Sequence, residues 1–188
     1  MSTTLPMEAV FRNRRGEARH LTVRRCEPQH LDAILALQSE VLRALPSAEL
    51  FALGTAEEYE ESLTLDCCLV AFDGETLVTF SLMIVNRVTP RSLGAALGYD
   101  SARMLKAVTY DSTFVAPSAR GFWLQRAFLP LKDAMAIALS ASEALATVAP
   151  GNAHSLNNLL ADGFTVVERR PMYGGLDRFI LRKTFGKE

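Results

Sequence analysis

The sequence has little of what several large protein classes require. Its 188 residues include only three cysteines, and two of them, Cys67 and Cys68, are adjacent within an apolar run. Three cysteines cannot form a network of disulfides, and neighbouring cysteines are poorly placed to pair with each other. We therefore expect Cys26, Cys67 and Cys68 to be buried, reduced thiols in a cytoplasmic protein.

An excess of charge of one sign is also missing. Twenty basic and twenty-one acidic residues leave a formal net charge of −1, so we expect neither nucleic acid nor an anionic membrane as a partner. No apolar run is long enough for a membrane-spanning helix, and residues 1–19 lack the apolar core of a signal peptide. No spacing of His, Cys, Asp or Glu resembles a metal site. The expected partner is a small molecule.

What the sequence does have is apolar residues, which make up 49% of the chain against 22% charged residues. A chain of this length and composition can bury a full core. We expect an N-terminal extension over residues 1–19, followed by a single domain over residues 20–188.

Within that domain, strand and helix patterns alternate along the chain. Strands are predicted at residues 20–25, 67–72, 77–85, 105–115, 143–148, 164–169 and 176–181. Helices are predicted after Pro28, after a capping box at Thr55 and Glu58, from Leu124, and after Asn152. Asp73 and Gly74 indicate a two-residue hairpin, and residues 86–103 a long loop that could cover a substrate site. The pattern predicts a mixed α/β domain with early antiparallel strands and a later parallel crossover.

The junction between the strand that ends at Val115 and the helix that begins at Leu124 has a distinct chemistry. The turn between them contains Arg120 and Gly121. Backbone N–H groups at a helix N-terminus, together with the helix dipole, attract anions, and a nearby arginine strengthens the attraction. The junction is therefore a candidate cradle for a phosphate or pyrophosphate.

Two motifs, together with the order of the elements, resemble the GNAT superfamily of acyl-CoA-dependent N-acyltransferases over about residues 20–185. The first is a strand end followed by R-G-x-G-x-G/A, which here consists of Val115, Pro117, Arg120, Gly121, Phe122, Trp123, Leu124 and Gln125. The second is P-x-N-x-x-A/S with a later G-F, which here consists of Pro150, Asn152, Ser155, Gly163 and Phe164.

The resemblance implies an α/β fold with a central mixed sheet of about six to seven strands flanked by about four helices. It implies acetyl-CoA or coenzyme A as cosubstrate, no metal, and a homodimer as one option. The pantetheine amides would meet the backbone of Phe114 and Val115, with Asn152 and Ser155 on the opposite side. The turn that would hold the pyrophosphate consists of Arg120, Gly121, Phe122, Trp123, Leu124 and Gln125.

The chain departs from the family pattern in the turn and in the last helix. Gln125 stands in the turn at the position of the third small residue. Trp123 replaces the second glycine of the turn, where glycine lets the backbone approach the pyrophosphate. Its indole could point outward and leave the amides free, stack on the adenine, or block the site. Leu159 stands where many members have the tyrosine that protonates the departing thiolate.

Asp111 and Tyr173 are the candidates for acid and base chemistry. In a regular strand Asp111 shares a face with Thr113 and Val115, where it could take a proton from the substrate ammonium or hold the amine by charge. It could equally be a hydrogen-bonded structural carboxylate. Tyr173 lies in a turn from which its phenol could reach the thiolate, or it could simply cover the core. Tyr110, on the opposite face from Asp111, is predicted to pack in the core.

Two functions follow as hypotheses. The first is an N-acetyltransferase that transfers an acetyl group from acetyl-CoA to a primary amine of a small molecule or peptide, by direct attack in a ternary complex. The alternative, prompted by Trp123 and Leu159, is a catalytically inactive protein of the same fold that binds CoA or another ligand or partner in a regulatory role.

Overall fold

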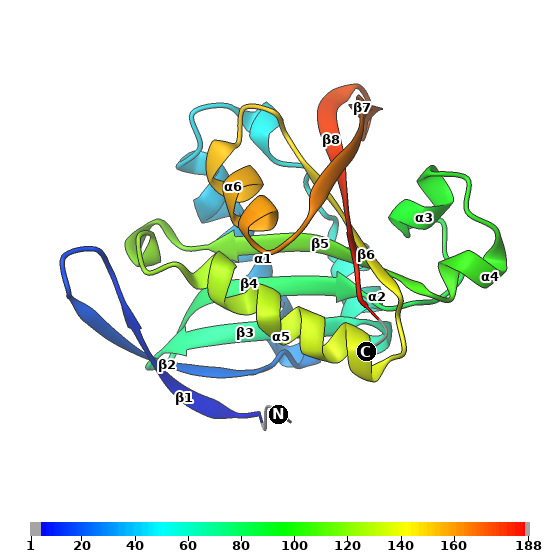
Figure 1. Ribbon diagram of the computed structural model, residues 1–188. Coiled ribbons are helices and arrows are strands. Elements are labelled where there is room, and N and C mark those ends of the chain that lie inside the picture. The colour runs from blue at the N-terminus through cyan, green and yellow to red at the C-terminus, as the bar shows by residue number, and fades with distance from the viewer. Residues whose placement is uncertain (1–4, 187–188) are drawn as a thin grey trace.

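One mixed β-sheet runs through the protein, in the strand order β1-β2-β3-β4-β5-β6-β8-β7 (Figure 1). The structure is a computed structural model that describes residues 5–186. The strands are β1 (Met7–Arg12), β2 (Ala18–Arg25), β3 (Cys67–Asp73), β4 (Thr76–Ile84), β5 (Ala107–Val115), β6 (Glu143–Val148), β7 (Thr165–Met172) and β8 (Leu176–Thr184). The helices are α1 (Leu31–Arg43), α2 (Ala56–Leu65), α3 (Leu93–Ala96), α4 (Ser101–Met104), α5 (Leu124–Ala138) and α6 (Ala153–Ala161).

The pairing of the strands confirms the predicted mixed α/β class. Strands β1 to β5 pair antiparallel in chain order, and β5 then pairs parallel with β6 after the crossover through α5. The last hairpin adds β8 beside β6 and leaves β7 at the edge. In Figure 1, α5 crosses in front of β3, β4 and β5, while α1 and α2 lie behind the sheet. The sheet has eight strands, more than the six to seven expected.

The additional strand is β1, which lies within residues 1–19, the segment predicted to be an N-terminal extension. Met7, Ala9 and Phe11 pack against the core, while the residues between them point outward, and β1 pairs with β2 along its whole length. Residues 7–19 therefore continue the sheet instead of preceding it. The segment MEAVFR carries the period-two alternation of a half-buried strand. Residues 1–4 lie outside the described residues.

Local sequence signals placed most helix ends correctly. The predicted capping box is present, with the backbone N–H of Glu58 bonded to Thr55 and the Glu58 carboxylate bonded to the Thr55 N–H. Asn152 caps α6 by accepting a hydrogen bond from the Ser155 N–H at 3.1 Å, and Gly163 ends that helix with φ +91°. Residues 86–103, predicted as a loop, contain the single helical turns α3 and α4.

Two local predictions need correction. The hairpin of β3 and β4 turns at Gly74 and Glu75, one residue later than predicted, because Asp73 still pairs with Thr76. Gly74 supplies the positive φ of +58° at the first loop position. All three cysteines are free thiols, as expected, but only Cys67 and Cys68 are buried. Cys26 is half-buried beside the edge of the core.

Aromatic side chains pack β4 and β5 against α2 on the back of the sheet. The Phe114 ring stacks on Phe80 with centroids 5.6 Å apart, and Tyr59 from α2 meets both rings edge-on. The Tyr59 hydroxyl donates to Gln38 Oε1 on α1 at 2.6 Å, so its polar end is satisfied inside the core. This cluster fixes the position of β5, which forms one wall of the site described next.

Candidate active site

Strands β5 and β6 separate partway along their length. Their parallel pairing runs from Ala107 and Glu143 to Tyr110 and Ala146 and then stops, although β5 continues to Val115 and β6 to Val148. Beyond this point, neither strand pairs with the other, so each leaves a backbone edge facing the gap. A cleft opens where the two strands diverge.

A β-bulge in β5 lies at the mouth of the gap. Tyr110 pairs with Met83 and Thr113 with Ser81, so Asp111 and Ser112 together oppose one residue of β4. As a result, Tyr110 and Thr113 both reach α5, whereas an odd spacing in a regular strand would put them on opposite faces. The period-two argument that placed Asp111 on the face of Thr113 was therefore wrong.

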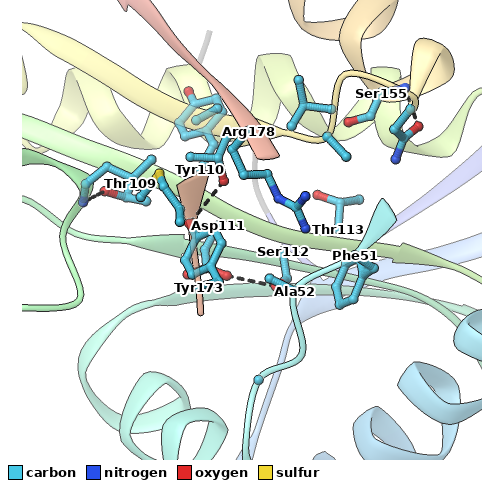
Figure 2. Close-up of a pocket in the computed structure, with 18 of the residues that line it drawn as sticks. Phe51, Ala52, Thr109, Tyr110, Asp111, Ser112, Thr113, Ser155, Tyr173 and Arg178 are labelled. Carbon is cyan, nitrogen blue, oxygen red and sulfur yellow. Dashed lines mark hydrogen bonds between the residues drawn. The ribbon is translucent and has the colours of Figure 1, made fainter. Parts of the chain in front are cut away.

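Asp111 nevertheless lines the cleft. The cleft has a volume of about 440 Å³ and lies between β5, the ends of β6 and β8, the helices α5 and α6, and the segment between α1 and α2. Figure 2 shows Asp111, Ser112 and Thr113 along one wall, with Tyr173 and Arg178 coming from the last hairpin. The two catalytic candidates, Asp111 and Tyr173, thus meet in one cavity although 62 residues separate them in the sequence.

The environment of Asp111 suits proton transfer. Its carboxylate is exposed to the cleft, but the cleft walls surround it, and this removal from bulk water raises the pKa of Asp111 above its usual range. The Ser112 hydroxyl donates to Asp111 Oδ1 at 2.8 Å and opposes this rise, as do the charges of Arg91 and Lys132. A raised pKa makes Asp111 a stronger base than an aspartate on an open surface.

Tyr173 stands over the separated end of β6. The Tyr173 hydroxyl lies 3.0 Å from Thr147 Oγ1, and the residue occupies the left-handed backbone region with φ +51°. Removal from water raises the pKa of the Tyr173 phenol, so the phenol keeps its proton at neutral pH. The turn therefore places a protonated donor above the gap between β5 and β6.

Two cations of the cleft were missed by the sequence analysis. Lys132 on α5 is buried and donates to the Leu82 carbonyl at 2.9 Å, opposite the bulge, and to Thr113 Oγ1 at 3.4 Å. Burial lowers the pKa of Lys132 to about 8. Arg178 on β8 is also buried, and it points into the cleft (Figure 2).

Gln125, expected in the pyrophosphate turn, and Ser155, expected beside the pantetheine, bond to each other and so join α5 to α6. Gln125 Nε2 donates to Ser155 Oγ at 2.8 Å, and Asn158 Nδ2 donates to Gln125 Oε1 at 2.8 Å. Gln125, Ser155 and the capping residue Asn152 all line the cleft. Leu159, which takes the place of the family tyrosine, is buried in the same wall.

The other predicted cofactor residues lie outside the cleft walls. Phe114 belongs to the aromatic core, and Val115 is half-buried and pairs with Thr79 of β4. The part of β5 that does line the cleft is residues 109–113. In the turn, Arg120 is exposed and its Nη1 donates to the Ala44 carbonyl at 3.4 Å.

The rest of that turn leads directly into α5. Gly121 has φ +88°, Phe122 and Leu124 are buried, and Trp123 is the residue immediately before the helix. The Trp123 side chain makes no capping hydrogen bond, so the first N–H groups of α5 keep the open donors of a helix N-terminus.

The Trp123 indole points away from the cleft. Its ring lies 5.1 Å from the Arg14 guanidinium and lines a separate shallow groove beside β1. Its backbone has φ +60° and ψ +24°, the left-handed conformation that a glycine adopts without cost. The tryptophan thus holds a backbone conformation that favours glycine, and its side chain lies toward the hairpin of β1 and β2.

This geometry predicts an unusual order of stability for two variants. Trp123→Gly should be more stable than Trp123→Ala by about 1–2 kcal/mol, because both lose the indole but only alanine retains the cost of the left-handed backbone. Urea unfolding of the two variants measures the difference. Equal stability, or a more stable alanine variant, would contradict the strained conformation.

Comparison with known proteins gives a clear result only at the level of structure. No protein-family model and no curated protein matches the sequence. Among solved structures, a GCN5-related N-acetyltransferase from Kribbella flavida shares 21% identity over 88% of this chain and 98% of its own, with a TM-score of 0.66. The yncA protein of Salmonella typhimurium, solved with its cofactor acetyl-CoA, shares 16% over 89% and 95%, with a TM-score of 0.68. The PaiA N-acetyltransferase of Thermoplasma acidophilum, in complex with coenzyme A, shares 14% over 88% and 99%, with a TM-score of 0.65.

This chain has the GNAT fold. The resemblance drawn from the two sequence motifs is confirmed for the fold, even though Trp123 interrupts the first motif. Within residues 5–186, no cluster of three or more His, Cys, Asp and Glu residues is arranged to hold a metal ion. None of the helices in the described part of the chain is long and apolar enough to cross a membrane.

Proposed function

We propose that this protein is an N-acetyltransferase that transfers an acetyl group from acetyl-CoA to a primary amine by direct attack in a ternary complex. The observation that carries the proposal is the convergence of Asp111 and Tyr173 on the gap between β5 and β6. The presence of acetyl-CoA or coenzyme A in two solved structures of the same fold supports the choice of cosubstrate.

The chain offers the groups that such a cosubstrate needs. The free edges of β5 and β6 present backbone N–H and C=O groups to a pantetheine chain, and Asn152 and Ser155 flank them. The N–H donors and positive end of α5 suit a pyrophosphate, and the Trp123 side chain makes no capping hydrogen bond to those donors. When bound, acetyl-CoA supplies an activated acetyl thioester.

The proposed chemistry assigns one proton to each candidate. The bound ammonium first releases one proton to water and becomes a neutral amine. Asp111 accepts the second proton as the amine nitrogen bonds to the acetyl carbon, and its raised pKa favours this transfer. Tyr173 donates its phenolic proton to the sulfur from which that carbon departs. The backbone N–H groups at the unpaired edge of β5 polarise the acetyl carbonyl.

Calorimetric titration with acetyl-CoA, followed by a thiol-release assay on a panel of primary amines, tests this function. We expect saturable binding, release of free thiol with a subset of the amines, and a change in the emission of Trp123, the only tryptophan in the chain. Saturable binding with no thiol release on any amine would argue against catalysis.

The second candidate is a non-catalytic protein of this fold that binds CoA or another ligand for regulation. The buried Leu159 favours it, because no proton donor occupies that wall position. Melting temperature with saturating CoA separates the possibilities, since a ligand that binds only the folded state raises it. A shift without turnover supports a regulatory CoA binder, and no shift supports a different ligand or partner.

A further inference from the structure

Arg178 is a cation with an unused donor in the wall of the cleft. Its side chain is only 3% exposed, and its guanidinium reaches from β8 toward the middle of the cavity (Figure 2). Nη1 donates to the Asp177 carbonyl at 2.8 Å. Nη2 is buried and has no hydrogen-bond partner among the described residues.

No carboxylate of the described residues forms an ion pair with this guanidinium. The neighbouring Asp177 carboxylate is bound to Arg169 at 2.6 Å, and Asp177 and Glu49 act on Arg178 only through their charge. Burial lowers the pKa of Arg178 in spite of these charges. Leaving a buried charge and donor unmatched is costly, so the arrangement indicates that an anion from outside completes it.

The other cations of the cleft have partners within the protein. Arg91 Nη1 donates to the Glu58 carbonyl, Glu61 and Ser62, and Lys132 donates to the Leu82 carbonyl. Among the cleft cations that the structure describes, Arg178 is thus the one with a buried donor left open.

Arg178 and Asp111 face the same cavity from different walls, Arg178 from β8 and Asp111 from β5 (Figure 2). The Arg178 guanidinium lies 5.9 Å from the centroid of the Tyr173 ring, and Asp111 lines the same cleft as that ring. A molecule beside Tyr173 therefore finds a carboxylate on one side and a guanidinium on another. This pair of charges matches a ligand that carries both an ammonium and an anion.

We propose that the acceptor is an amine that also carries a carboxylate a few bonds away, with Arg178 binding the carboxylate and Asp111 the ammonium. The proposal rests on the proposed acetyltransferase function and narrows its substrate class. A planar guanidinium matches a carboxylate through paired hydrogen bonds. An analogue without the carboxylate would leave Arg178 unmatched and bind poorly.

Matched substrates test the proposal directly. The panel consists of the twenty α-amino acids, the carboxamide and the decarboxylated amine of each one that reacts, and dipeptide amides whose only carboxylate is the side chain of an acidic second residue. We expect the amino acid to exceed its carboxamide and its decarboxylated amine in kcat/KM by about tenfold to a hundredfold. The dipeptides show whether the carboxylate belongs to an amino acid or to a peptide side chain. Carboxamides or decarboxylated amines that react as well as the amino acids would overturn the proposal.

Variants of Arg178 provide the second arm. Arg178→Met should raise KM for the acid about tenfold or more, change kcat little, abolish the preference for acids, and leave calorimetric binding of acetyl-CoA unchanged. Arg178→Lys should restore part of the preference, which also guards against a folding defect. Arg43→Met is the matched control, because Arg43 is an exposed arginine at the end of α1 and does not line the cleft. An unchanged preference in Arg178→Met would overturn the proposal.

Binding measurements separate this proposal from the function on which it rests. If acetyl-CoA binds and amines without a carboxylate are the better acceptors, the acetyltransferase function stands and the carboxylate site is wrong. If acetyl-CoA does not bind, the proposed function is wrong. Calorimetry with the same amino acids then decides the Arg178 site: binding that Arg178→Met abolishes supports it, and absence of binding overturns it.

Discussion

Asp111→Asn should lower kcat/KM for the amine about a thousandfold and leave the affinity for acetyl-CoA unchanged. Loss of a positioned general base costs a factor of about 10²–10⁴, and this variant also removes the charge that holds the ammonium. The asparagine keeps the size of the side chain and its hydrogen bond with Ser112. Thiol release measures the rate, and calorimetry measures cosubstrate binding.

The pH profile distinguishes a base from a merely structural carboxylate. The rate of the wild-type protein should fall as pH drops through the raised pKa of Asp111, because a protonated carboxyl cannot accept the proton. That limb should be absent from Asp111→Asn. Asp32→Asn, at an exposed position of α1, is the control and should behave as wild type. If Asp111→Asn retained more than about a tenth of the activity, Asp111 would be structural, because even the weakest general base contributes more.

The parts of the fold that sequence reasoning found are those with a local cause. The Thr55–Glu58 box and the Asn152 cap satisfy the backbone donors of their own helices, so a few neighbouring residues specify them. The bulge at Asp111 and the separation of β5 from β6 depend on how distant strands pair. No short stretch of sequence records such a pairing, so the face of Asp111 was predicted wrongly.

The same distinction explains which cleft residues were found. Asp111 was singled out for its chemical type and Tyr173 for its place in a turn, and both line the cleft. Arg178 and Lys132 carried a signal that was overlooked: each is a charged residue at an inward position of an amphipathic element. Arg178 shares the buried face of β8 with Ile180, and Lys132 follows Phe128 by one turn of α5. A charge at such a position indicates a buried polar role.

Lys132 also makes the stability of the protein depend on pH. In the unfolded chain its pKa is near 10.5, and burial lowers the pKa of Lys132 to about 8 in the folded protein. Below pH 8 the residue is charged in both states, and folding bears the full cost of burying the cation. Between about pH 8 and pH 10.5 the folded protein releases the proton while the unfolded chain keeps it, so the contribution to stability rises with pH. At about 1.4 kcal/mol for each unit of pKa, the total rise is about 3 kcal/mol.

Lys132→Met should remove this dependence. Relative to wild type, the variant should be about 3 kcal/mol more stable at pH 7 than at pH 10.5, because only wild type gains stability over that interval. Urea unfolding at both pH values measures the change, and other titrating groups cancel in the comparison of the two proteins. A difference that does not vary with pH would show that the Leu82 carbonyl and Thr113 stabilise the charged ammonium fully. In that case Lys132 would stay charged over the whole pH range measured, and its charge would oppose the rise in the pKa of Asp111 at every pH in that range.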